Sequence, residues 1–201
     1  MNFKYHPKLA TLLKNVEQFL IATIPNTVRS LHINEPVYAV FLWYQDSSVA
    51  DGFAPQFGVG TESVLLACNR QYPTDRLAAT DCRWRPQQVV EDMNLVRQRG
   101  FPSTDFMREC NEAYSIMLAA NETGRPLPDE GELLWPFRAM MHSVATRLNE
   151  IDWKNFLNIT DDFVVVSLDS IGNWLAEDLK ESMSAGKYLM LQKRNLLFDS
   201  E

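Results

Sequence analysis

The residue types that most often carry chemistry are scarce in this chain and lie far apart. Histidine occurs 3 times, at His6, His32 and His142, and no two of them have the short spacing of zinc ligands. The patterns of zinc peptidases and serine nucleophiles, HExxH, GxSxG and SxxK, are missing from the sequence. We therefore predict no catalytic residue, no metal site and no cofactor, and we expect a protein that is not an enzyme.

The 3 cysteines, Cys68, Cys82 and Cys110, are an odd number without CxxC spacing. Such a set suits neither a disulfide framework nor a zinc site, so we expect free, mostly buried thiols. A cysteine nucleophile would require His142 to fold against Cys68 or Cys110. Because these cysteines lie on apolar helical stripes, packing is the preferred interpretation.

Gly58 and Gly60 stand before an expected helix start, where backbone amides and the helix dipole attract phosphate. A dinucleotide-binding fingerprint needs a third glycine where Ser63 stands, and a P-loop needs Lys followed by Ser or Thr. We therefore interpret the two glycines as part of a strand end.

Carboxylates are abundant, notably at Glu91, Asp92, Asp129, Glu130, Glu132, Asp161, Asp162, Glu177, Asp178 and Glu181. Most fall in loops or on polar helix faces, where solvation accounts for them. Asp169 differs because it ends an apolar strand, and we expect it to cap the helix that follows.

Arginines surround a tryptophan in one short stretch of the sequence. Arg76, Arg83 and Arg85 lie close to Trp84, and this mixture of guanidinium and aromatic groups suits phosphates, carboxylates or a partner protein. Asp75 and Asp81 neutralise part of the charge. The candidate partner-binding residues are Asp46, Arg76, Arg83, Trp84, Arg85, Asp161 and Asp162.

Two apolar segments predict the strands that position these groups. Val37–Tyr44 is apolar throughout and rich in β-branched and aromatic residues, which favours a central strand covered on both faces. Residues 163–169 form the second clear strand, and residues 53–60 predict a weaker strand that follows the first as a hairpin. The sequence thus predicts an α+β fold with a central sheet that contains strands near residues 37–45 and 163–169.

Apolar residues at three- and four-residue spacing predict the helices. These helices cover residues 9–24, 61–72, 104–123, 133–148, 170–183 and 187–197. Pro25 is expected to stop the first helix and Thr61 to cap the second. Residues 74–90 are the least regular, with a short strand expected around Trp84. No repeat or linker interrupts the chain, so we expect one globular domain over residues 1–201.

The composition limits the classes of partner. Lys and Arg number 19 against 26 Asp and Glu, which gives a net charge of −7, and such a surface repels nucleic acid. Lys14 and Glu17 interrupt the leucine-rich start, so no signal peptide is expected. The longest apolar run, Val37–Tyr44, is too short to span a membrane. We therefore expect a cytoplasmic protein without nucleic-acid or membrane partners.

Three segments carry a resemblance to a known family: 36–46 (PVYAVFLWYQD), 83–86 (RWRP) and 162–169 (DFVVVSLD). Together they resemble the bacterial family called domain of unknown function 4303. The resemblance covers most of the chain and implies an α+β domain in the bacterial cytoplasm. It supplies no catalytic residues.

The leading hypothesis is an immunity protein that neutralises a cognate toxin by direct binding, since an acidic surface is attracted to the basic clefts of many nuclease toxins. The first alternative is a hydrolase or transferase that uses Asp161, Asp162 or Asp169 near the strand ends. The second is a homodimeric scaffold domain, which would bury a large apolar self-contact.

Overall fold

The computed structural model describes residues 7–44, 55–86, 101, 103–122, 135–169 and 174–198, except for the side chains of residues 118 and 120–122. Its sheet has the order β2-β1-β3, with β1 (Val37–Tyr44) between β2 (Gln56–Thr61) and β3 (Ile159–Asp169). β2 runs antiparallel to β1, whereas β3 runs parallel to it, with Val40 beside Val165. The predicted α+β class and the pairing of the two main strands are confirmed.

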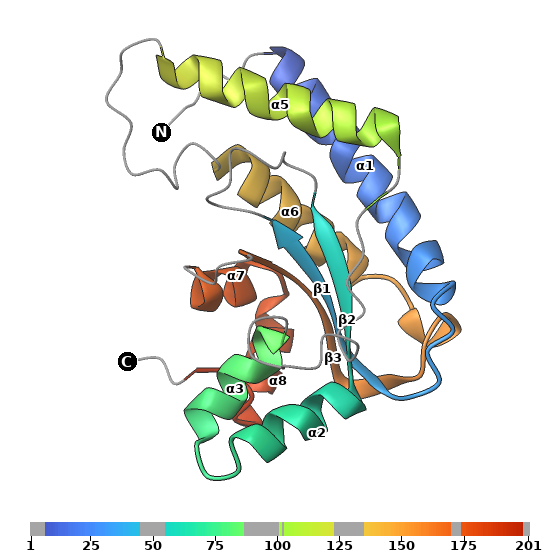
Figure 1. The fold of residues 1–201 in the computed structure, drawn as a ribbon, viewed down its shortest axis with the longest axis vertical. Helices are drawn as coiled ribbons and strands as arrows, with labels where there is room; N and C mark the ends of the chain where they lie inside the picture. Colours follow the sequence, from blue (N-terminus) through green and yellow to red (C-terminus); the bar gives the residue numbers. More distant parts are fainter. Residues whose placement is uncertain are drawn as a thin grey trace.

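Helices close over the sheet from both sides (Figure 1). One core holds side chains of β1, α1 (Pro7–Arg29), α5 (Thr104–Glu122) and α6 (Trp135–Leu148). The other holds side chains of β1, β3, α2 (Glu62–Gln71), α3 (Arg76–Trp84), α7 (Leu175–Glu181) and α8 (Ala185–Lys193). Every residue of β1 is buried, as its apolar run predicted.

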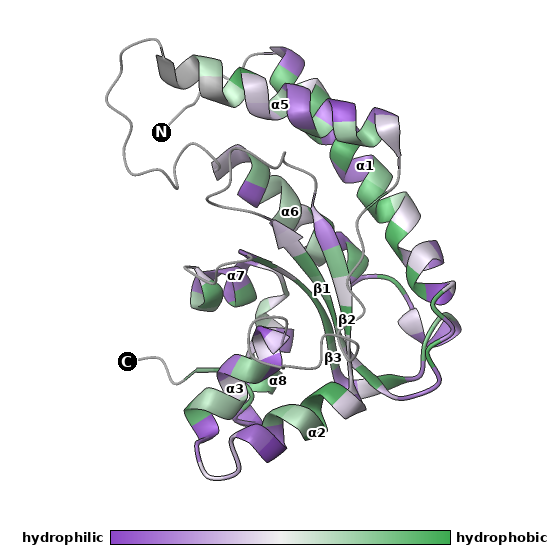
Figure 2. Cartoon of the chain, viewed as in Figure 1, coloured by the Kyte–Doolittle hydropathy of each residue, from purple (hydrophilic) through white to green (hydrophobic). Residues whose placement is uncertain are grey.

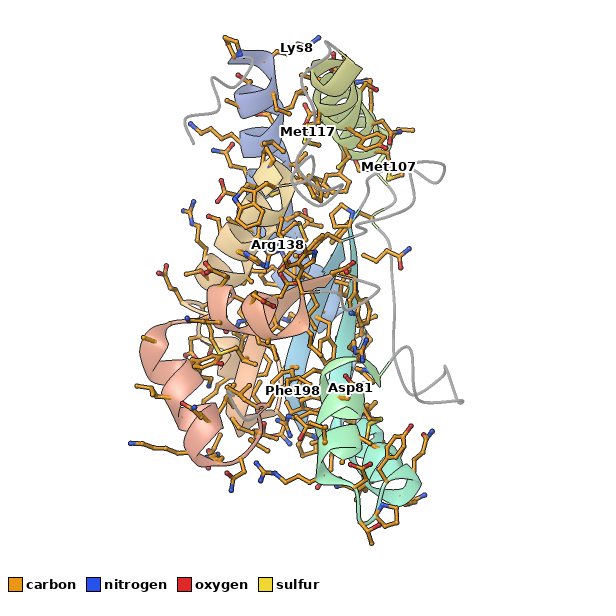
Figure 3. The ribbon with its side chains drawn as sticks, turned by 90° about the vertical axis from the view of Figure 1, so that its left-hand side faces the viewer. Lys8, Asp81, Met107, Met117, Arg138 and Phe198 are labelled. Atoms are coloured by element: carbon orange, nitrogen blue, oxygen red, sulfur yellow. A yellow bond between two sulfur atoms is a disulfide. The ribbon has the colours of Figure 1, made fainter. Side chains whose placement is uncertain are left out.

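Hydropathy follows this arrangement. The middle of β3 is hydrophobic and its two ends carry hydrophilic residues, whereas the helices carry both kinds along their length (Figure 2). In the turned view, Lys8 and Met117 lie at one end of the molecule, Asp81 and Phe198 lie towards the other, and Arg138 lies between them (Figure 3). Among the described helices, none combines the length and the apolar character that crossing a bilayer requires.

The predicted stop of the first helix at Pro25 is wrong, because α1 continues to Arg29. A proline inside a helix removes a backbone hydrogen bond at a cost of about 3 kcal/mol. Ile24, Pro25 and Val28 are all buried in the core, and this burial offsets the loss. Thr27 adds a hydrogen bond from its hydroxyl to the carbonyl of Thr23 at 2.9 Å.

The strand expected around Trp84 is also wrong, since residues 76–84 form α3. Asp75 begins the helix, where its side chain accepts a hydrogen bond from the Ala78 amide at 3.0 Å. The start of α2 differs from the prediction too. Thr61 occupies the cap position without a side-chain hydrogen bond, and the carboxylate of Glu35 accepts from the Ser63 amide at 2.9 Å instead.

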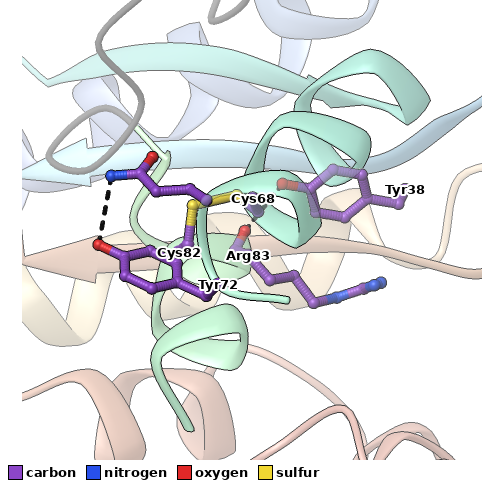
Figure 4. Close-up of a disulfide and its surroundings, with 6 residues drawn as sticks. Tyr38, Cys68, Tyr72, Cys82 and Arg83 are labelled. Atoms are coloured by element: carbon purple, nitrogen blue, oxygen red, sulfur yellow. Dashed lines mark hydrogen bonds between the residues drawn. A yellow bond between two sulfur atoms is a disulfide. The ribbon is translucent and has the colours of Figure 1, made fainter. Parts of the chain in front are cut away.

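Cys68 and Cys82 form a disulfide that joins α2 to α3, so the prediction of free thiols is wrong for both (Figure 4). Their Cα atoms lie 5.6 Å apart because the two short helices pack against each other. Cysteine spacing alone did not reveal this contact. Cys110 is a free buried thiol as predicted, and burial, the largest effect, raises its pKa to about 12.

Gly58 and Gly60 belong to β2, which confirms that they are strand residues. A Cβ atom on Gly60 would lie 2.5 Å from Cζ of Tyr38, and one on Gly58 would meet the ring of Trp43. The glycines are therefore needed because aromatic rings from β1 lie across them.

The outer edge of β3 is occupied by side chains. Asn149 donates to the carbonyl of Val165 at 2.7 Å and accepts from its amide at 2.8 Å. The Ser182 hydroxyl accepts from the Ser167 amide at 2.9 Å and donates to the Ser167 carbonyl at 3.1 Å. At Val165 and Ser167, the backbone groups that an edge strand would leave unpaired are thus bonded within the chain.

Candidate functional site

The structure brings two of the predicted binding residues into direct contact. Nη2 of Arg83, in the last turn of α3, lies 2.7 Å from Oδ2 of Asp162 in β3, and these side chains are only 8% and 15% exposed. Burial would raise the pKa of Asp162, but hydrogen bonding from Thr160 and the charge of Arg83 outweigh it and lower the pKa. Asp162 is therefore a permanent negative charge near neutral pH.

Arg83 is held by aromatic rings as well as by Asp162. Its guanidinium lies 4.6 Å from the ring centroid of Tyr38 and 5.1 Å from that of Trp84. The Tyr38 hydroxyl donates to the backbone carbonyl of Arg83 at 2.8 Å. Trp84 is fully buried and donates from its indole nitrogen to the carbonyl of Leu196 at 2.7 Å. Trp84 therefore supports Arg83 from the core instead of meeting a partner at the surface.

Lys187 of α8 completes a charged row, which we define as Arg83, Asp162, Lys187 and Asp161. The pKa of Lys187 is lowered, chiefly by burial, although the charges of Asp162 and Asp161 act in the opposite direction. The charged row therefore combines two basic and two acidic groups contributed by α3, β3 and α8.

The remaining predicted residues lie outside this row. Arg85 pairs with Asp81 within its own segment, with Nε 2.9 Å from Oδ1. Arg76 is exposed at the start of α3. Asp46 lies outside the described residues. The arginines that cluster in the sequence therefore do not form one surface patch.

A hollow of about 420 Å³ lies beside the charged row, at the amino end of β3. Glu150, Asp152 and Asp161 line it and are exposed, and Lys154 and Lys187 line it as well. Its apolar lining comes from Ile151, Trp153, Ile159 and Phe163. An apolar floor with a charged rim suits the side chain of a protein partner.

A second polar group, the Asp178 cluster, lies at the opposite end of the parallel strands. Asp178 is fully buried and accepts from the hydroxyl of Tyr44 at 2.8 Å, from Nε of Arg138 at 2.8 Å and from the amide of Asp169 at 2.7 Å. Nε2 of His142 lies 2.9 Å from the same carboxylate. The cluster therefore joins β1, β3, α6 and α7.

The environment of Arg138 fixes its charge. Burial would lower its pKa, but the charge of Asp178 and the hydrogen bonds of Asp178 and Tyr44 raise it. The guanidinium also lies 5.0 Å and 5.2 Å from the ring centroids of Trp135 and Trp174. Because the carboxylate of Asp178 is buried and accepts from Tyr44, Arg138 and the Asp169 amide, its chemistry is that of a structural anchor.

Sequence reasoning missed this cluster. Asp178 was expected on a solvated helix face, which is wrong, and Arg138 was not considered. A signal was present: Asp178 lies between Leu175 and Leu179 on the buried side of α7, and Arg138 and His142 are four residues apart on α6. A charge on an apolar face requires a buried partner.

The aspartates of the enzyme hypothesis do not come together in one site. Asp161 lies in the hollow, Asp162 pairs with Arg83, and Asp169 is buried at the far end of β3. Within the described ranges, no three His, Cys, Asp or Glu side chains gather as metal ligands would. Comparisons of this chain with protein-family models, with curated proteins and with solved structures found no match.

Proposed function

We propose that this chain is a bacterial immunity protein that binds a cognate antibacterial toxin and neutralises it by direct contact in the cytoplasm. The observation that carries the proposal is the hollow at the amino end of β3, with its exposed carboxylates beside the charged row. In a chain of net charge −7, these groups favour a partner with a basic surface.

The same residues suit binding better than catalysis. A hydrolase or transferase would need a carboxylate whose pKa lies close to the working pH. The pKa of Asp162 is lowered, which makes its carboxylate a weaker base. The salt bridge to Arg83 also occupies one of its oxygens. A fixed pattern of charges selects among protein partners without any proton transfer.

The test is binding and protection with the toxin encoded beside this gene. Cells that produce the toxin should survive only when they also produce this protein. The affinity, measured by calorimetry, should fall as salt is raised from 50 to 200 mM, because exposed charges are screened. Failure to bind or to protect against that toxin would refute the proposal.

A matched pair of variants locates the contact. Asp161→Lys reverses a charge in the hollow, and Glu177→Lys makes the same change on an exposed position of α7 outside it. We expect about a 10-fold or greater loss of affinity for the first variant, equivalent to about 1.4 kcal/mol, and less than about 3-fold for the second. Equal losses would show that only net charge matters and would exclude the hollow as the contact.

A further inference from the structure

The disulfide between Cys68 and Cys82 lies in the last turn of α3, the helix that carries Arg83. Both cysteines are buried, and they are 14 residues apart in the sequence. Figure 4 shows Cys82 next to Arg83 on α3, with Cys68 reaching it from α2. The covalent bond therefore holds the residue immediately before the one that pairs with Asp162.

The same end of α3 also contacts the sheet and the C-terminal segment. The Arg83 carbonyl accepts from Tyr38 of β1, its guanidinium pairs with Asp162 of β3, and the Trp84 indole donates to Leu196. At the opposite end of α3, Arg76 and Leu77 are exposed. A change at Cys82 is thus transmitted to the charged row through one peptide bond.

We infer that Cys68 and Cys82 form a redox-controlled clamp that sets the position of α3 and of the Arg83–Asp162 pair. The oxidised pair fixes α3 against α2, and the reduced pair lets α3 separate from the sheet more often. The proposed cytoplasmic setting is reducing, and disulfides in such a compartment are usually transient and redox-sensing, which suits a regulatory bond. Control of toxin affinity by this clamp rests on the proposed function, whereas control of α3 does not.

The chemistry requires an oxidant that is itself a disulfide, such as glutathione disulfide, and this oxidant reaches the two buried thiols only while α3 is separated from α2. One cysteine thiolate attacks one sulfur of that disulfide, which forms a mixed disulfide between the protein and glutathione and releases the other glutathione as a thiol. The second cysteine then displaces the bound glutathione and closes the Cys68–Cys82 bond. Two protein thiols lose two electrons and two protons, and one glutathione disulfide becomes two thiols.

The first test counts thiols in the intact chain. After treatment with glutathione disulfide and denaturation, alkylation should modify Cys110 alone, whereas the chain treated with dithiothreitol should accept a label on Cys68 and Cys82 too. The oxidised protein should melt about 6–12 °C higher, as expected for closing a loop of this length in a chain of this size. Labelling of all cysteines after oxidation would overturn the clamp.

Variants separate the disulfide from general effects of the reductant. The double variant Cys68→Ala, Cys82→Ala should melt at the same temperature with and without dithiothreitol. Cys110→Ala should keep the full shift between oxidised and reduced protein, because Cys110 is outside the bond. A shift that persists in the double variant would contradict the inference.

Hydrogen exchange tests the movement of α3 without any toxin. Amides of α3 should exchange at least about ten times faster in the reduced protein, while those of α5 should not change. Equal exchange of α3 in both states would refute the clamp. If α3 loses protection on reduction but the toxin affinity is unchanged, the clamp does not control toxin binding. If the toxin binds in neither state, the proposed function is refuted and the clamp remains established.

Discussion

Replacing Asp178 by asparagine tests the role of the Asp178 cluster most directly. Asparagine keeps the shape of the side chain, but it removes the charge that balances Arg138. The salt bridge has a donor–acceptor distance of 2.8 Å between side chains that are 8% and 0% exposed, so solvent does not screen it. Arginine does not lose its proton in proteins, and an uncompensated buried charge costs about 3–5 kcal/mol. We expect the free energy of unfolding to fall by that amount.

Urea unfolding followed by tryptophan fluorescence measures the change. With an m-value of about 2 kcal/mol/M, the midpoint should move down by about 2 M while the m-value stays constant. Glu177→Gln is the matched control, because it removes a carboxylate from the neighbouring exposed position of α7. That variant should change the free energy of unfolding by less than about 0.5 kcal/mol.

A double-mutant cycle decides whether charge balance is the cause. Arg138→Met alone removes the cation that pairs with Asp178, and combining it with Asp178→Asn removes both charges. The double variant should be less destabilised than the sum of the single variants, because no unpaired charge remains. The reasoning is wrong if the free energy of unfolding of Asp178→Asn lies within about 1 kcal/mol of that of the parent protein. It is also wrong if the destabilisations of the two single variants add in the double variant.

Three further predictions follow from the geometry. Asp162→Asn should lower the free energy of unfolding by about 2 kcal/mol at pH 7. Because the pKa of Asp162 is lowered in the folded protein, this stabilisation is present above the ordinary carboxyl pKa of 3.8 and should disappear as the pH falls further below it. Acid-unfolding curves measure this loss. Gly60→Ala should destabilise the fold by about 1–3 kcal/mol in thermal melts, since its Cβ would lie 2.5 Å from the ring of Tyr38; an unchanged melting temperature would show that the ring can move. Native Cys110 should resist alkylation at pH 8 while the denatured chain reacts, because burial raises its pKa to about 12, and rapid labelling of the folded protein would contradict that environment.

The strands and most helices could be predicted because local patterns determine them. Val37–Tyr44 has no polar residue, so it had to be covered on both faces, and the structure places helices on each side. The helix over residues 104–123 was predicted from its apolar stripe, and α5 covers Thr104–Glu122. The Ser103 hydroxyl accepts from the Phe106 amide at 3.3 Å at its start.

Features that depend on distant contacts could not be predicted in the same way. Pro25 lies inside a helix only because tertiary burial stabilises it there. Around Trp84, α2 packs beside α3 and the disulfide joins the two helices. Local propensity contains neither of these contributions, and tertiary packing overrides it.

The candidate site was predicted in part. Arg83, Asp161 and Asp162 were named from the sequence, and the structure places them in one row with Lys187, which had drawn no attention. Arg76 lies outside the charged row, because it is exposed at the start of α3 whereas Arg83 is buried at its end. A cluster in sequence becomes a patch in space only when the helical phase allows it.

The side chains along the outer edge of β3 also limit how other chains can associate with this one. Asn149, Ser182 and Asp178 occupy the amides of alternate residues, so an incoming strand would find those donors already taken. Along Val165–Asp169, these bonds oppose both sheet extension by a second copy and capture of an extended peptide by main-chain pairing. A partner that docks beside this part of β3 must therefore bind through side chains, and a substitution at Asn149 would free the amide and carbonyl of Val165 alone.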